Sequence, residues 1–253
     1  MRKFGLKLWS VNTDTYLREA VKLYARGAFD YIEVYFVPGS DATARDWKAT
    51  GIPSIVHGPH LGHGVSLATP ELRESNLRAF RAAARFADAL SAPTIIAHGG
   101  AFGSPTEVVR QMKEIGDPRL VIENNPFLHA DRSGRKLAVS TPQEVREVLE
   151  GGPGVRFCLD FGHAVSSANA HGLDWREFLE SFLSLGPALY HLSDIGIGSD
   201  VDQHLHFGEG SFPIADVLPR LPDNAMISIE TRHDFRENLD DFVRDAETLR
   251  KIP

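Results

Sequence analysis

Residues 157–163 read Phe-Cys-Leu-Asp-Phe-Gly-His, an apolar run that ends at Asp160 and is followed by His163 three positions later. A buried strand that stops at a carboxylate, with an imidazole on the turn behind it, is typical of a metal-ligand pair at the mouth of a barrel. A single Asp at a strand end is more commonly a helix cap or a loop anchor. Several other apolar runs also end at a potential ligand, and this repetition favours a metal site; they close at His57, His98, Glu123, His191 and Glu230.

The pattern of apolar residues along the chain predicts alternating strands and helices. Eight strands are expected over residues 4–9, 31–36, 53–57, 94–98, 120–123, 155–160, 188–192 and 225–230. Helices are expected over residues 13–26, 41–49 and 70–90, after the cap residues Ser104, Thr141 and Asp174, and over 214–220 and 236–250. Such alternation predicts an α/β fold with parallel strands and right-handed crossovers.

We predict a (β/α)8 TIM barrel that forms a single domain over residues 1–253, because the candidate site residues all lie at the carboxyl ends of strands. An open doubly wound sheet is the alternative, but no Gly-rich dinucleotide fingerprint follows the first strand. Side chains two positions before each proposed ligand lie on the same face of the strand as that ligand. We expect them to fill the barrel interior. These are Ile55, Ile96, Val121, Cys158, Leu189 and Ser228.

The composition is that of an ordinary globular protein, with 42% apolar and 24% charged residues. No apolar run approaches the ~20 residues of a membrane helix, and the start of the chain leads directly into a strand. A single cysteine excludes an internal disulfide and predicts a reducing, cytoplasmic location. The net charge of −7 shows no global basic field, although bound divalent cations would offset much of it. A phosphate-bearing partner therefore stays possible, and no obligate protein partner is evident.

Three further donors extend the strand-end set. His163 follows the sixth strand, and Asp202 and His204 lie in the long loop 194–212. Imidazole and carboxylate donors without a thiolate suit zinc, manganese or iron and exclude a Cys-type structural zinc site. The complete set is too large for one ion and matches about three ions with three to four protein ligands each.

The order of these segments resembles endonuclease IV, the metal-dependent apurinic/apyrimidinic endonuclease family within the xylose isomerase-like TIM barrels. The matching segments span about 175 residues and are His57-Gly-Pro, Ile96-Ala-His98-Gly-Gly, Val121-Ile-Glu123, Cys158-Leu-Asp160-x-x-His163-Ala, His191-Leu-Ser-Asp194, Asp202-x-His204-x-x-x-Gly208-Glu-Gly210 and Ile229-Glu230. The sixth-strand and long-loop motifs are the most specific, whereas the Glu, Asp, His, Glu quartet is shared by the whole superfamily.

The resemblance implies a zinc-dependent hydrolase of DNA repair that cleaves DNA 5′ to abasic sites, using a metal-bound hydroxide at a three-metal centre. It implies that Glu123 bridges two ions and, with Glu230, orients the attacking water. The first ion would be completed by His57 and His98, the second by Asp160, His191 and Glu230, and the third by His163, Asp202 and His204. Zinc is the expected ion, with manganese an option at one or more positions.

Substrate contacts are less specific in the sequence. The family typically has an aromatic residue in the loop after the third strand, where this chain has His60 and Leu61. These two residues would either insert between stacked bases or pack within the loop, and the sequence leaves both roles open. Arg45 is a candidate contact to a nucleic-acid backbone. The helix that carries it has the pattern of an ordinary surface helix. His206 is a candidate by proximity to His204. Arg132, Arg135 and Lys136 form a small basic cluster that suits either phosphate or solvent.

A sugar isomerase or epimerase of the same superfamily is the main alternative. It would need one ion, held by Glu123, Asp160, His191 and Glu230, and its substrate would be a small sugar. Glu33 in the second strand is reminiscent of those relatives. They often place an Arg six residues after the seventh-strand His, where this chain has Ile197. A non-enzymatic, metal-stabilised or sugar-binding barrel is the third interpretation.

Overall fold

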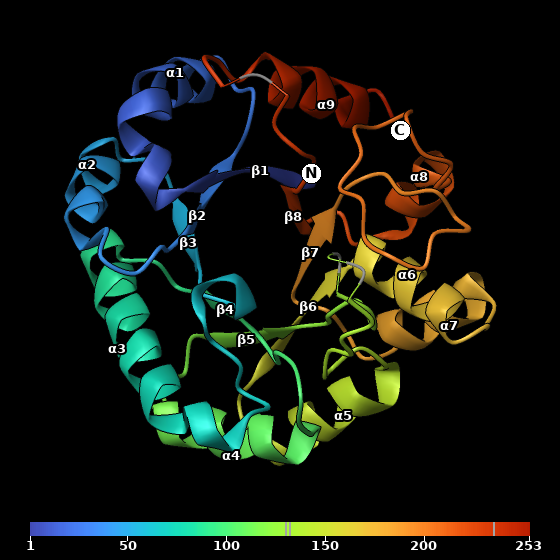
Figure 1. Cartoon of the computed structure of the whole chain (residues 1–253). Coiled ribbons are helices and arrows are strands. Elements are labelled where there is room, and N and C mark those ends of the chain that lie inside the picture. Colours follow the sequence, from blue (N-terminus) through green and yellow to red (C-terminus); the bar gives the residue numbers. More distant parts are fainter. Residues whose placement is uncertain (130, 132, 235) are drawn as a thin grey trace.

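Eight parallel strands close into a barrel in the computed structural model, with β1 paired to both β2 and β8 and a ring of helices outside (Figure 1). The structure describes residues 1–129, 131, 133–234 and 236–253. The strands are β1 Lys3–Trp9, β2 Tyr31–Tyr35, β3 Ser54–His57, β4 Ile95–His98, β5 Leu120–Glu123, β6 Arg156–Asp160, β7 Leu189–Leu192 and β8 Met226–Ile229. The predicted TIM barrel is confirmed, and the open sheet is excluded.

The helices of the described residues lie on the outside of the barrel. They are α1 Thr13–Ala25, α2 Ala44–Ala49, α3 Arg73–Leu90, α4 Pro105–Ile115, α5 Pro142–Gly151, α6 Phe161–Ala170, α7 Trp175–Leu183, α8 Ile214–Val217 and α9 Asp240–Arg250. All three predicted caps are present as hydrogen bonds, and Asp174 accepts the backbone N–H groups of Arg176 and Glu177. Ser104 accepts the backbone N–H of Glu107, and Thr141 forms a full capping box with Glu144.

Two helical predictions were wrong in detail. Residues 161–163 were expected to be a turn, but they form the first turn of α6, so two helices follow β6. The last helix was expected from about residue 236, whereas α9 begins at Asp240. The first difference matters for the site, because it places His163 on a helix whose N-cap is Asp160.

Apolar side chains form two separate layers. The outer layer fills the space between strands and helices, and the inner layer fills the barrel. The inner layer contains Tyr31, Ile55, Ile96, Val121, Cys158 and Leu189. Five of these six were predicted from strand parity, and Cys158 is the buried core residue that we expected.

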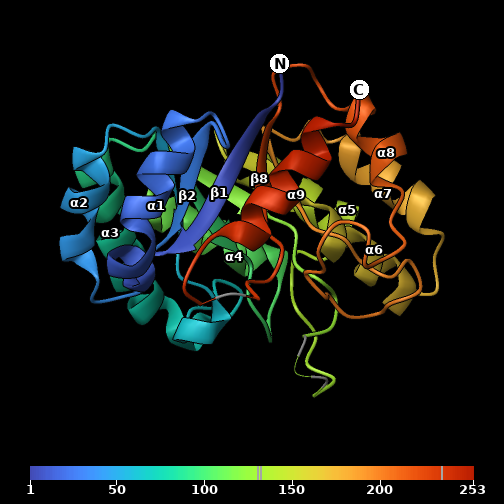
Figure 2. The same ribbon diagram turned by 90° about the horizontal axis from the view of Figure 1, so that it is seen from above.

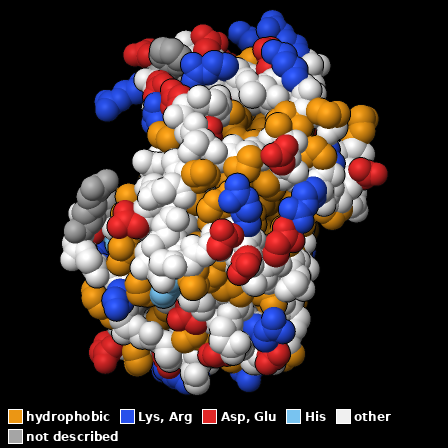
Figure 3. Space-filling model, turned by 90° about the vertical axis from the view of Figure 1, so that its right-hand side faces the viewer, with side chains coloured by type: hydrophobic (Ala, Val, Ile, Leu, Met, Phe, Trp, Pro, Cys, Tyr) orange, Lys and Arg blue, Asp and Glu red, His pale blue; other side chains and the backbone are white. Residues whose placement is uncertain are grey.

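The carboxyl ends of the strands open at one end of the barrel, where the long loops gather (Figure 2). The loop between β5 and α5 extends furthest from that end. Over the face that carries α7 and α8, Lys and Arg are interspersed with Asp and Glu, and no broad field of one sign is visible (Figure 3). Within the described residues, no helix is long and apolar enough to cross a membrane.

Candidate metal centre

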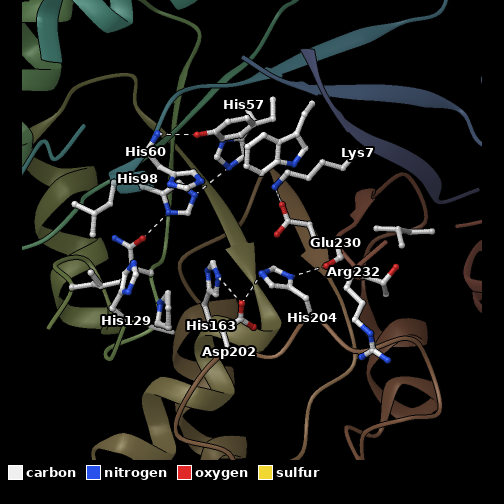
Figure 4. A pocket seen from close by; sticks show the side chains of 18 of the residues that line it. Lys7, His57, His60, His98, His129, His163, Asp202, His204, Glu230 and Arg232 are labelled. Carbon is white, nitrogen blue, oxygen red and sulfur yellow. Dashed lines mark hydrogen bonds and ion pairs between the residues drawn. The ribbon is translucent and has the colours of Figure 1, made fainter. Parts of the chain in front are cut away.

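The nine predicted ligands converge at the mouth of the barrel in three sets, of which the first two share Glu123. Figure 4 shows six of the nine ligands, which are His57, His98, His163, Asp202, His204 and Glu230. Within each set, the candidate ligand atoms lie within 4.8 Å of one another. The sets are His57, His98 and Glu123; Glu123, Asp160, His191 and Glu230; and His163, Asp202 and His204. This grouping is the one that the resemblance implied for three ions.

Glu123, the last residue of β5, lies at the centre of the arrangement and is fully buried. One of its oxygens, Oε2, lies 3.4 Å from Nε2 of His57 and 3.1 Å from Nε2 of His98. The other oxygen, Oε1, lies 3.2 Å from Nδ1 of His191 and 3.3 Å from Nδ1 of His163. Each oxygen of this carboxylate therefore faces a different group of imidazoles, as a bridging ligand requires.

Each of the five histidines has one ring nitrogen beside an acceptor oxygen. This oxygen is either a backbone carbonyl or a side-chain oxygen of a residue that is not one of the nine predicted ligands. The distances are 2.8 Å from His57 Nδ1 to Gly58 O, 2.6 Å from His98 Nδ1 to Asn125 Oδ1, 2.8 Å from His163 Nδ1 to Asn124 O, 3.0 Å from His191 Nε2 to Glu33 Oε2, and 2.6 Å from His204 Nδ1 to Glu230 O. Such an acceptor fixes the tautomer and leaves the second nitrogen free to bind a cation.

The donor atoms themselves are short of hydrogen-bond partners. Among the described residues, buried atoms without one include both carboxylate oxygens of Glu123, Oδ2 of Asp160, Nδ1 of His191, Oδ1 of Asp202 and Oε1 of Glu230. The Glu123 oxygens and Nδ1 of His191 lie at ion-pair distances from other members of the donor sets, and Oε1 of Glu230 also forms an ion pair with Lys7. Lone pairs that are buried, unpaired and convergent are costly unless a cation binds them. The residues present therefore fit divalent metal ions.

Asp160 ends β6 and also caps α6. Its Oδ1 accepts the backbone N–H of His163 at 2.7 Å, while Oδ2 faces the donor set. Asn124 holds the strand end, since its side chain accepts the N–H of Asp160 at 2.8 Å and donates to its carbonyl at 2.9 Å. The helix cap uses one carboxylate oxygen and leaves the other toward the donor set, so the cap role and the metal-ligand role that were weighed as alternatives are compatible.

The loop 194–212 is held by Asp194. Its two carboxylate oxygens accept the N–H groups of Ile195, Gly208, Gly210 and Phe212 at 2.8–3.2 Å. A Cβ on Gly210 would lie 2.3 Å from Asp194 Oδ1, so this close approach needs glycine. The loop thereby brings the Oδ2 atom of Asp202 within 2.6 Å of His204 and 3.6 Å of His163.

The surrounding charges shift the histidine pKa values in opposite directions. Burial, followed by the charge of Lys7, lowers the pKa of His57 to about 4, although Glu123 opposes the shift. Burial also disfavours the charged ring of His163, but Asp160, Asp202 and Glu123 outweigh it and raise its pKa to about 10. His57 is thus ready to bind a cation as neutral imidazole, whereas His163 binds one in exchange for a proton.

A cavity of about 440 Å³ lies over the donor sets. His60 and Leu61 line it, and their contact with a substrate stays a prediction. Burial and the nearby His98 and His57 lower the pKa of His60 to about 2, so its ring is neutral.

Two predicted contacts lie elsewhere. Arg45 is on the exposed face of α2 and does not line the cavity, while Trp47 beside it is fully buried. His206 is buried away from the cavity, with Nδ1 2.6 Å from Asp245 and Nε2 3.1 Å from Asp234. Substrate contacts by Arg45 and His206 stay predictions without support from this geometry.

Four residues near the donors were missed or left without a role. Lys7 forms ion pairs with Glu230 and, at 3.4 Å, with Glu33. Lys7 also lines the cavity with Trp9 and Tyr35. Strand parity alone places Lys7, Trp9, Glu33 and Tyr35 on the inward face of β1 and β2, and this signal could have found them.

Comparison with known proteins supports this architecture. Residues 20–252 match the model of the xylose isomerase-like TIM barrel family, and the chain belongs to that family. A probable endonuclease 4 of Symbiobacterium thermophilum is 23% identical over 189 residues, which cover 69% of this chain and 68% of that protein.

Solved structures share the fold at low identity. A D-tagatose 3-epimerase-like protein has a TM-score of 0.73 at 21% identity, with 99% of this chain and 96% of the other covered. Endonuclease IV of Thermus thermophilus has a TM-score of 0.67 at 20% identity, with coverage of 98% and 97%. The family includes enzymes, and its members near this chain fall into both the endonuclease and the epimerase or isomerase groups.

Proposed function

We propose that this chain is a metal-dependent phosphodiesterase that cleaves DNA on the 5′ side of abasic sites and binds about three divalent ions, principally zinc. The observation that carries the proposal is the position of Glu123, which belongs to two of the three donor sets and whose two oxygens face separate groups of imidazoles. A one-ion enzyme has no need for His57, His98, Asp202 and His204 in that arrangement.

The protein residues then have distinct roles. Bound divalent ions would supply Lewis acidity and lower the pKa of a bound water to about 7. Glu123 and Glu230 orient the attacking water, and the acceptors behind the five histidines keep the ligand nitrogens aimed at the cavity. Lys7 lies beside Glu230 and provides a cation within reach of a phosphoryl oxygen.

Support for a nucleic-acid partner comes from the rim. Arg135 lies over the ring of Phe102, and Lys136 lies over the ring of Phe127, on the loop that extends from the mouth (Figure 2). Arg135 also lies 3.6 Å from Asp131, and we expect both cations to contact a phosphate backbone. Arg132, the third member of the predicted basic cluster, lies outside the described residues.

The test is metal content per chain together with cleavage of an abasic duplex, measured for the wild type and for His204→Ala. We expect about three metal equivalents in the wild type and about two in the variant, with turnover lowered at least about 100-fold because one ligand set is broken. His171→Ala is the matched control, since His171 is exposed and outside the donor sets. Unchanged metal content and turnover in His204→Ala would overturn the proposal.

A single-ion sugar isomerase or epimerase is the second candidate. The contact between Glu33 and His191 favours it, because Glu33 holds a member of the quartet of Glu123, Asp160, His191 and Glu230. In that case, the wild type would hold about one equivalent of manganese or a similar ion and would convert a ketose in a substrate panel.

A further inference from the structure

Strands β1 and β2 carry none of the nine predicted metal ligands, yet their inward side chains form one wall of the cavity. Lys7 and Trp9 come from β1, and Tyr35 comes from β2, with Trp9 and Tyr35 in register as neighbours. The strands from β3 to β8 supply or precede the metal ligands, so this wall is free to contact the organic part of a substrate.

The aromatic side chains of the wall pack against one another. The Trp9 and Tyr35 rings lie 4.6 Å apart between centroids at an angle of 40°. Tyr35 is buried, and its hydroxyl lies 2.7 Å from Nδ1 of His63 and accepts the N–H of His60 at 3.3 Å. His63 also contacts the indole at 5.9 Å between centroids. One side of the Trp9 ring is therefore packed against fixed neighbours.

Trp9 itself is 40% exposed, whereas Trp47 and Trp175 are buried. An indole that is held in place and lines a cavity rich in charged groups provides an apolar surface for a flat ligand. Aromatic side chains of this kind bind nucleic-acid bases by stacking, and every base offers a suitable face.

Lys7 gives this wall a positively charged end, while Trp9 forms its aromatic end. It lies two residues before Trp9 on the same face of β1 and forms an ion pair with Glu230, a member of the second donor set. A ligand that spans both residues has an anionic group toward Lys7 and the donor sets and a planar group toward Trp9. A nucleotide has this combination, and a sugar phosphate without a base does not.

We infer that Trp9, supported by Tyr35, stacks on a base of a nucleotide substrate and so determines specificity for it. The inference rests on the proposed phosphodiesterase function and identifies the stacked base as one adjacent to the abasic sugar. Trp9 is a binding residue here, and the hydrolytic step does not pass through it.

The experiment measures binding of 2′-deoxyadenosine 5′-monophosphate and of 2-deoxyribose 5-phosphate to the metal-loaded protein. In the wild type, the nucleotide should quench tryptophan fluorescence and bind about tenfold or more tightly than the sugar phosphate. By calorimetry, Trp9→Ala should lose that preference and Trp9→Phe should keep most of it. Val11→Ala is the control, because Val11 is exposed near Trp9 but outside the cavity.

Cleavage kinetics provide an independent measurement. Trp9→Ala should raise KM for an abasic duplex about tenfold with little change in kcat, because stacking contributes to binding alone. Equal affinity of the wild type for the two probes, or unchanged nucleotide affinity in Trp9→Ala, would overturn the stacking inference even if cleavage occurs. Selective nucleotide binding without cleavage would support the stacking site and instead overturn the proposed hydrolysis.

Discussion

At the scale of single residues, Glu33 and His191 show how buried charges are arranged behind the candidate metal centre. Oε2 of Glu33 lies 3.0 Å from Nε2 of His191 and accepts the hydroxyl of Ser228 at 2.5 Å. Burial opposes the charged form of this carboxylate, but His191 and Lys7 outweigh it and lower the pKa of Glu33. Glu33 therefore stays ionised and directs Nδ1 of His191 toward the donor set.

We expect Glu33→Gln to weaken metal binding about 10- to 100-fold, because the amide cannot hold the His191 ring in the same tautomer with the same strength. Competition with a chromophoric chelator would measure the dissociation constant. Glu71→Gln, on an exposed surface, is the control and should leave that constant unchanged. Equal metal affinity in the Glu33 variant and the wild type would show that Glu33 does not position His191.

At the scale of elements, the start of α6 shows how one residue can both cap a helix and belong to a donor set. Asp160 ends β6, caps α6 through Oδ1 and presents Oδ2 to the donor set. Gly162 follows it, and a Cβ there would lie 2.9 Å from Oδ1 of Asp202. The glycine lets the long loop approach the helix start, so the second and third donor sets depend on the same turn of chain.

Two substitutions at Asp160 should separate these roles. Asn is a good N-cap but a weak metal ligand, whereas Ala is neither. Both Asp160→Asn and Asp160→Ala should lose metal from the second set. In the metal-stripped proteins, the Ala variant should have a free energy of unfolding about 1 kcal/mol below that of the Asn variant in urea. Full metal content in Asp160→Asn would contradict the assignment of Oδ2 as a ligand.

At the scale of the whole molecule, closure of the barrel gathers buried carboxylates into one region. Glu33, Glu123, Asp160 and Glu230 are buried, and the Asp202 side chain is only 6% exposed. Such a concentration of negative charge is unfavourable unless cations offset it. The ligands also come from strands and loops spread over residues 57–230, so bound ions would connect distant parts of the chain.

Removal of metal should therefore lower the thermal stability. A ligand at about 1,000 times its Kd stabilises the native state by about 4 kcal/mol, which corresponds to about 8–16 °C in Tm for a protein of this size. We expect a Tm decrease of at least about 8 °C after dialysis against a chelator, measured by calorimetry and reversed by added zinc. A Tm that is insensitive to both treatments would contradict a metal-binding centre.

The amino-acid sequence by itself determined the barrel and its nine candidate ligands. Strands such as 120–123 and 156–160 are apolar and end in a donor, and the carboxyl ends of parallel strands meet at one end of a barrel. Local signals also identified most helices, but not α6, because its N-cap Asp160 is also the last residue of β6 and Gly162 in its first turn does not favour a helix.

Strand parity points inward at Lys7, Trp9, Glu33 and Tyr35, but only the tertiary structure decided which partner each of them meets. Lys7 meets Glu230 because β1 pairs with β8, which lies more than 200 positions further along the chain. Glu33 reaches His191 across the barrel interior, and Trp9 becomes a cavity wall only when Tyr35 packs behind it. These contacts join distant segments of the chain, so their roles follow from closure of the barrel and not from local sequence pattern.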